Sequence, residues 1–249
     1  PLGEGVASTY LRRGLAAGLL AGLLAGVFAF FVGEPLLDRA IAFEEASADT
    51  HGGARHGSHH GEEEVFSRPT QKVGLFFATG LFGTTVGGVF GLVFAFFRGR
   101  LAARGDLKRS LYLTAALFAG AFAIPFLKYP ANPPSVGDPS TIGARTAAYF
   151  TLVALSLLAV LAAWLVARGL RGRGVETSTR RAIVGAGLLL VVSVLFLTLP
   201  PAAPAEGFPS GLLWGFRLSS FGTQLVFWAG LGALFGLLCE RANRRGGMA

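Results

Sequence analysis

Charged residues and cysteines are scarce in this sequence. Only 14% of its 249 residues are charged, against roughly 25% in an average soluble domain, while 52% are hydrophobic. This balance excludes an ordinary soluble protein. It predicts an integral membrane protein, because apolar runs of about 20 residues, enough to cross a bilayer, recur along the chain. The single cysteine, Cys239, excludes a disulfide within the chain and a thiolate metal site.

Motifs of enzymes and nucleotide-driven motors are also missing. The sequence holds no GxxxxGK[ST], GxSxG or HExxH pattern. Its four histidines all lie between residues 51 and 60, so none remains for a catalytic dyad elsewhere. We therefore predict that the chain is not an enzyme and needs no cofactor, and that any uphill transport draws on a gradient or on another subunit.

The apolar runs predict six transmembrane helices, at about 14–34, 72–97, 109–128, 145–167, 182–199 and 218–239. Fifteen of the 22 basic residues fall on alternate connections, which by the positive-inside rule places both termini in the cytoplasm. The same topology explains the net charge of +8 without nucleic acid as a partner. The expected fold is an all-α integral membrane protein in which about six transmembrane helices form three serial helix hairpins, within one polytopic membrane domain over 1–249.

Three connections then face outward: a loop rich in histidine and acids at 38–70, and two proline-rich loops at 129–144 and 200–216. The first holds a histidine tract followed by three carboxylates, namely His51, His56, His59, His60, Glu62, Glu63 and Glu64. Neutral imidazole is a good ligand for late divalent transition metals, and tracts of this composition are typical of metal binding. We predict a flexible metal collector; the alternative is a solvated loop with incidental histidines.

Other polar residues are expected at the outer mouth or along the transit path. Acids gather at the outer end of the first helix and in the outward loops, where their summed field concentrates cations, although acids could also merely avoid the cytoplasmic loops. Further candidates lie beside the proline-rich loops and on the last helix, where hydroxyls could serve helix packing alone. The full set is Glu34, Asp38, Glu44, Glu45, Lys128, Asn132, Asp138, Arg145, Glu206, Arg217, Thr223 and Gln224.

Glycines recur at four-residue spacing on three of the predicted helices. The stripes are Gly14, Gly18, Gly22 and Gly26 on the first helix, Gly83, Gly87 and Gly91 on the second, and Gly232 and Gly236 on the sixth. Such a stripe gives a flat face on which another backbone can approach closely. It predicts tight helix packing, either within the chain or against a partner, including a second copy.

Several runs resemble the CbtA family of predicted cobalt transporter subunits. They are EPLLDRAIAFEEA from Glu34, EEVFSR ending at Arg68, PFLKYPANPPSVGDPSTIG and EGFPSGLLWGFRLSSFGTQL, and the similarity extends over essentially the whole chain. The resemblance implies cobalt uptake across the bacterial cytoplasmic membrane for cobalamin synthesis. It also implies a small partner with a single helix, CbtB.

The resulting expectation is a membrane permease subunit for divalent metal uptake, with Co²⁺ as the substrate and Ni²⁺ as a possible one. The tract at 51–64 would capture the ion outside, and the acids at the end of the first helix would receive it. The alternatives are a scaffold or metal sensor that docks a small partner without transport, and a channel for an anionic or small neutral solute that uses Lys128, Arg145 and Arg217.

Overall fold

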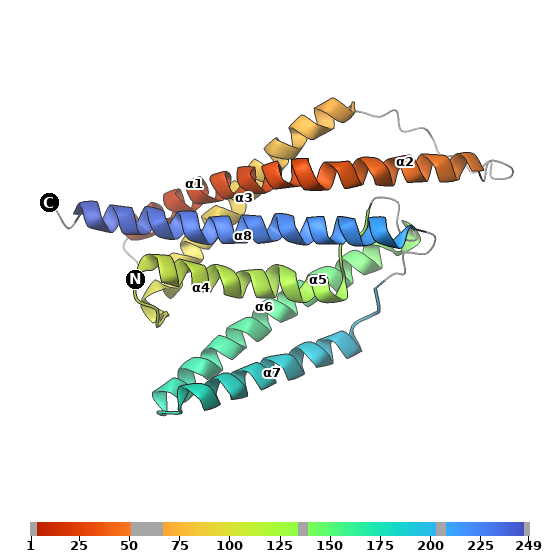
Figure 1. Cartoon of the computed structure of the whole chain (residues 1–249). Coiled ribbons are helices and arrows are strands. Elements are labelled where there is room, and N and C mark those ends of the chain that lie inside the picture. The colour runs from red at the N-terminus through yellow and green to blue at the C-terminus, as the bar shows by residue number, and fades with distance from the viewer. Residues whose placement is uncertain (1–3, 51–66, 134–138, 203–207, 247–249) are drawn as a thin grey trace. The chain divides into compact units, whose positions relative to one another are not determined.

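The computed structural model describes residues 4–50, 67–133, 139–202 and 208–246, and within these ranges every regular element is a helix (Figure 1). Six of the helices described are long and apolar enough to cross a membrane. The predicted fold class is therefore confirmed, and the chain is a multi-pass membrane protein.

The elements follow one another as α1 (Glu4–Phe28), η1 (Ala29–Gly33), α2 (Glu34–Thr50), α3 (Arg68–Phe97), η2 (Arg98–Arg100), α4 (Asp106–Phe118), η3 (Ala119–Ala123), α5 (Ile124–Lys128), η4 (Pro139–Thr141), α6 (Ile142–Gly172), α7 (Thr177–Thr198) and α8 (Ser210–Gly246). Of the short elements, η1 and η3 are π-helical turns, whereas η2 and η4 are 3-10 turns.

The helices extend further than the apolar runs alone indicated. α2 continues to Thr50, so the segment expected to be a loop from residue 38 begins as a helix, and α8 begins at Ser210, inside the predicted 200–216 loop. The helical stretch Gly5–Ala46 covers 42 residues, or about 63 Å, roughly twice the thickness of a hydrocarbon core. Hydrophobicity marks only the part of a helix that lies in lipid, and the charged turns of α2 project beyond it.

The first spanning helix, predicted to end near residue 34, continues past Pro35 into α2. The π-turn η1 precedes this proline, and the backbone N–H of Glu34 donates to the carbonyl of Ala29, five residues back. The same arrangement recurs at η3, where the Ile124 N–H donates to the Ala119 carbonyl just before Pro125. A π-turn widens the helix locally, which accommodates a ring that would otherwise clash with the preceding turn.

The chain divides into two compact units. The first comprises Pro1–Thr114, Asn132–Pro134 and Phe208–Ala249, and the second comprises Ala115–Ala131 and Ser135–Gly207. In the first unit α1 packs on α3 and on α8, and in the second α6 packs on η3, α5 and α7. The pairing of the first with the second span, and of the third with the fourth, follows the predicted hairpins. The fifth span, α7, belongs to the second unit and the sixth, α8, to the first, so neither unit contains the third predicted hairpin.

Glycine allows α1 and α3 to touch backbone to backbone. A Cβ atom at Gly18 would lie 2.0 Å from the Gly83 carbonyl oxygen, and one at Gly87 would lie 2.3 Å from the Gly14 carbonyl oxygen. Neither position can accept any side chain without moving the helices apart. The glycine stripes on the first two spans therefore serve the interior of one chain and are not free to join two copies.

α8 closes the first unit against α1, α3 and α4. Phe90 and Phe94 of α3 pack edge to face on Phe235 of α8, with ring centroids 5.0 and 4.9 Å apart, and all three are buried. On another side of α8, the Thr114 side chain occupies the space that a side chain at Gly232 would fill. The Gly232 carbonyl accepts a hydrogen bond of 2.7 Å from the Ser110 hydroxyl. The glycine stripe predicted on the sixth span thus faces α4.

In the second unit a serine replaces a backbone donor that Pro125 lacks. The Gly120 carbonyl would need the N–H of residue 125 in the π register, and the Ile124 N–H is already bonded to Ala119. The Ser156 hydroxyl donates to the Gly120 carbonyl instead. The Leu152 carbonyl also lies within hydrogen-bond distance of the Ser156 hydroxyl, but it already accepts a backbone hydrogen bond within α6. The hydroxyl therefore stabilises the protein more by donating to the Gly120 carbonyl.

Replacing Ser156 by alanine should lower the free energy of unfolding by about 1–3 kcal/mol, because a buried carbonyl loses its only donor. Ser156 is 0% exposed. Thermal unfolding of the detergent-solubilised protein measures the effect, and the exposed Ser193 of α7, changed to alanine, is the matched control. Equal melting temperatures for the two variants would contradict this role.

Candidate functional site

Two carboxylates of α2 face two basic side chains of α3. Arg68 Nη2 lies 3.0 Å from Glu34 Oε2 and also pairs with Asp38, and Lys72 Nζ lies 2.9 Å from the second oxygen of Asp38. Residues 34 and 38, like 68 and 72, are four apart and so share a helix face. We refer to these four residues as the Glu34 cluster.

The Glu34 cluster is formally neutral, because its two acids meet two bases. Its burial is uneven: the side chain of Glu34 is 13% exposed and that of Asp38 is 45% exposed. Ion pairs with this much access to water contribute only about 0–1 kcal/mol each, so a competing cation can displace them. The carboxylates are thus accessible to an incoming cation, in competition with Arg68 and Lys72.

Two further acids of α2, Glu44 and Glu45, are exposed and lie beyond the Glu34 cluster toward Thr50. The predicted tract His51, His56, His59, His60, Glu62, Glu63 and Glu64 lies outside the described residues, as do Asp138 and Glu206. Within the described ranges, no group of three or more His, Cys, Asp and Glu side chains is arranged to hold a metal ion.

Of the predicted residues on α8, Arg217 reaches another segment of the chain whereas Thr223 bonds its own helix. Arg217 Nη2 donates to Asn132 Oδ1 at 2.9 Å, and its guanidinium lies 5.4 Å from the centroid of the Trp214 ring. The Thr223 hydroxyl donates to the Ser219 carbonyl within the same helix at 2.9 Å, and Gln224 is half-buried. Asn132 and Arg217 are therefore brought together, whereas Thr223 serves its own helix.

In the second unit, Lys128 joins the ends of two helices. Its Nζ donates to the Phe196 carbonyl near the end of α7 at 2.7 Å, and the Tyr129 hydroxyl donates to the Pro200 carbonyl at 2.7 Å. Burial raises the pKa of Tyr129, so its hydroxyl remains a donor at neutral pH. These bonds hold α5 to α7. Arg145, also in this unit, occupies the first turn of α6.

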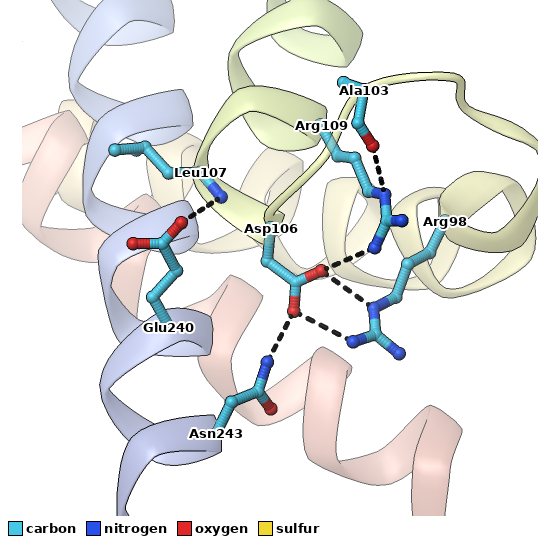
Figure 2. Close-up of polar contacts among 7 residues, drawn as sticks. All are labelled: Arg98, Ala103, Asp106, Leu107, Arg109, Glu240 and Asn243. Carbon is cyan, nitrogen blue, oxygen red and sulfur yellow. Dashed lines mark hydrogen bonds and ion pairs between the residues drawn. The ribbon is translucent and has the colours of Figure 1, made fainter.

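At the N-terminal end of α4, a buried carboxylate links three segments of the first unit (Figure 2). Asp106 Oδ1 accepts from Arg98 Nε at 2.9 Å and Arg109 Nη1 at 3.2 Å, while Oδ2 accepts from Arg98 Nη2 at 3.1 Å and Asn243 Nδ2 at 3.0 Å. Its side chain is only 2% exposed. We call these four residues the Asp106 hub.

Neighbouring contacts reinforce this hub. Glu240 of α8 accepts a hydrogen bond of 3.3 Å from the backbone N–H of Leu107, which satisfies a free donor in the first turn of α4. Gly105 has a φ of +83°, a conformation that side chains disfavour, and it turns the chain into α4 at Asp106. The hub thereby joins η2, α4 and α8 at one end.

The family model for the CbtA family, described as "probable cobalt transporter subunit", matches residues 7–240. The chain belongs to the CbtA family. The match includes both the Glu34 cluster and the Asp106 hub except for Asn243. A family of transporter subunits suggests that the chain is not an enzyme, and the word subunit agrees with the expectation of a partner. No curated protein and no solved structure gave a match.

Sequence reasoning missed several residues that this CbtA-family structure brings together. It named Glu34 and Asp38 but not their partners Arg68 and Lys72, although the repeated four-residue spacing was a usable signal. It also missed Asp106, Ser110 and Thr114, which are buried and recur every four residues along α4. A polar stripe inside an apolar helix indicates packing against another helix.

Proposed function

We propose that this CbtA-family chain is the membrane permease subunit for uptake of a divalent metal ion, Co²⁺, across the bacterial cytoplasmic membrane. Both termini lie in the cytoplasm in this proposal, so the Glu34 cluster faces outward and the Asp106 hub faces inward. The tract at 51–64 captures the ion, and the carboxylates of the Glu34 cluster receive it.

One observation carries this proposal: the tract connects the two helices that build the cluster. α2 ends at Thr50 and α3 begins at Arg68, so residues 51–66 join the helix of Glu34 and Asp38 to that of Arg68 and Lys72. Asp38 lies twelve residues before Thr50, or about 18 Å along the helix. An ion released from the tract therefore has a short route to carboxylate oxygen.

Exchange of partners at the Glu34 cluster supports passage of an ion. Co²⁺ that binds Glu34 or Asp38 displaces a guanidinium or an ammonium group, which then repels the ion and limits how tightly it is held. Conduction requires such weak, repeated binding, because an ion that binds too tightly does not leave. Nickel would be accepted by the same oxygen and imidazole ligands.

Two partners complete the proposal. The chain resides in the lipid bilayer, and a small CbtB-type subunit with one helix assembles with it. A second candidate function is a scaffold or metal sensor that docks this subunit without transporting metal. The charge balance of the Glu34 cluster favours that candidate, since its carboxylates are already paired with Arg68 and Lys72.

Uptake of radiolabelled Co²⁺ and Ni²⁺ into liposomes that hold the purified chain, with and without the one-helix subunit, separates these functions. We expect saturable Co²⁺ flux for which Ni²⁺ competes poorly. Stoichiometric metal binding without flux in either preparation would replace the permease by the sensor or scaffold.

Changing His51, His56, His59 and His60 together to alanine should reduce Co²⁺ uptake at low metal and leave the maximal rate unchanged. The tract raises the local concentration of the ion, an advantage that disappears when bulk metal is abundant. Initial rates over a range of Co²⁺ concentrations measure this effect. A variant with Ser58 and Ser67 changed to alanine is the control, and identical rates at low metal for the two variants would exclude capture by the tract.

A further inference from the structure

The two π-turns each leave a backbone carbonyl without a donor in its own helix. In η1 the Glu34 N–H is bonded to Ala29, so the Phe30 carbonyl would need the N–H of residue 35, and Pro35 has none. In η3 the Gly120 carbonyl is in the same position relative to Pro125. Neither the α nor the π register supplies the missing hydrogen bond.

The two carbonyls differ in what replaces that donor. Ser156 donates to Gly120. No side chain within the described ranges donates to Phe30, even though η1 lies within the spanning stretch Gly5–Ala46. A polar backbone group left unmet in a membrane costs several kcal/mol, and irregular backbone there is tolerated only inside the protein or along a path for water and ions. The open carbonyl therefore points to a ligand.

A second unmet oxygen lies against the same turn. Ser219 of α8 is 5% exposed, and among the described residues its hydroxyl has no hydrogen-bond partner. Its Oγ lies 3.2 Å from the point where a Cβ atom of Gly33 would be, so the absence of a side chain at Gly33 lets the hydroxyl reach the backbone of η1. A hydroxyl of a residue this little exposed, with no protein partner, is an independent sign of a ligand.

Glu34 adds a carboxylate at the end of this turn. Its Oε2 accepts from Arg68, whereas Oε1 has no partner within the described part of the chain. Phe30 and Glu34 are four residues apart and lie on one side of the helix. The carbonyl and the carboxylate of this turn, with the hydroxyl that α8 places against Gly33, present lone pairs and a negative charge, which suit a hard or borderline cation rather than an anion.

We propose that the Phe30 carbonyl, the Ser219 hydroxyl and the Glu34 carboxylate form an oxygen subsite for a partly dehydrated divalent cation, just inside the Glu34 cluster. This inference rests on the proposed function, because it identifies the step that follows capture. Water completes the coordination, and the site holds the ion weakly since Arg68 competes for Glu34. Because Pro35 has no N–H to donate, the Phe30 carbonyl remains available to the ion.

The test restores the missing donor. Pro35→Ala supplies an N–H to the Phe30 carbonyl, and Pro125→Ala makes the same change at η3, where Ser156 already occupies the carbonyl. Both are made in the full chain with the four histidines changed to alanine and Glu62, Glu63 and Glu64 changed to glutamine, so that the tract does not bind metal. Equilibrium dialysis with Co²⁺ should show one weak equivalent that P35A binds at least tenfold less tightly and that P125A retains.

Ser219→Ala provides a variant that leaves the backbone untouched. We expect it to weaken the same equivalent by at least threefold, whereas Ser193→Ala, at an exposed position on α7, should not. Size-exclusion profiles identify any variant that fails to fold, in which case the other variant decides. Unchanged Co²⁺ binding in folded P35A or folded S219A would overturn the subsite and leave water as the partner of the Phe30 carbonyl.

Flux measurements keep this result separate from the proposed function. If the parent chain transports Co²⁺ and P35A binds and transports it equally well, the permease stands and the subsite fails. If no preparation transports Co²⁺ but P35A still loses the weak equivalent, the subsite stands and the permease fails.

Discussion

Replacing Gly83 by leucine is expected to abolish the native packing of the first unit. A Cβ at this position would lie 2.3 Å from the Gly18 carbonyl oxygen and 2.8 Å from the Gly22 Cα, both of them backbone atoms that cannot rotate away. α1 and α3 would have to separate by several ångströms, which opens the glycine interface along its length. Overpacking a well-packed core typically costs about 1–3 kcal/mol, and a backbone collision exceeds that range.

Gly74→Leu is the matched control for this substitution. Gly74 lies on the same helix, but a Cβ there would meet nothing within 4 Å. We expect G83L to run as an aggregate and G74L to run as the parent does when detergent extracts are compared by size-exclusion chromatography. A monodisperse G83L protein with the parent melting temperature would show that α1 and α3 do not pack through their glycines.

Asp106→Ala is expected to have the second largest effect. The substitution removes all four hydrogen bonds of the carboxylate and leaves Arg98 and Asn243 without their shared acceptor. Removing one partner of a fully buried ion pair costs about 3–5 kcal/mol, and the loss here should fall below that range because the side chains of Arg98 and Arg109 are partly exposed and stay hydrated. Unfolding by a denaturing detergent, followed by far-UV circular dichroism, measures the loss.

A double-mutant cycle identifies the cause of that loss. If the unpaired charge of Arg98 dominates, Asp106→Ala combined with Arg98→Met should be less destabilised than the sum of the two single variants. Glu176→Gln is the control, since Glu176 is an exposed carboxylate that makes no capping bond to α7. Additive effects at Asp106 and Arg98 would contradict a coupled hub.

The two charged clusters differ in how easily their partners exchange. The carboxylate of the Asp106 hub is only 2% exposed and accepts from two arginines and an asparagine, although these partners themselves reach water. The Glu34 cluster is partly solvated, so its ion pairs contribute little and can be replaced by a cation. In the permease that we propose, an ion should therefore enter at the Glu34 cluster, while the hub keeps α4 and α8 together at the other end.

The amino-acid sequence determined the number of spans and the use of glycine. Both depend on local features: about 20 consecutive apolar residues are needed to cross the bilayer, and glycines four residues apart lie on one helix face wherever the helix is placed. The resemblance to the CbtA family was likewise visible in the sequence alone, and the family match over residues 7–240 confirms it. The sites named at Glu34 and Asp38 remain predictions for the transport path.

Only the tertiary structure decided which polar groups meet. Arg68 reaches Glu34 across 34 residues of sequence, and Asn243 reaches Asp106 across 137, distances over which local patterns give no information about pairing. The structure also showed that the helix continues past Pro35 by way of a π-turn. A proline leaves one backbone carbonyl of its helix without a donor, and a side chain from another helix decides whether that carbonyl gains one. Ser156 donates to the Gly120 carbonyl, whereas no side chain among the described residues donates to the Phe30 carbonyl.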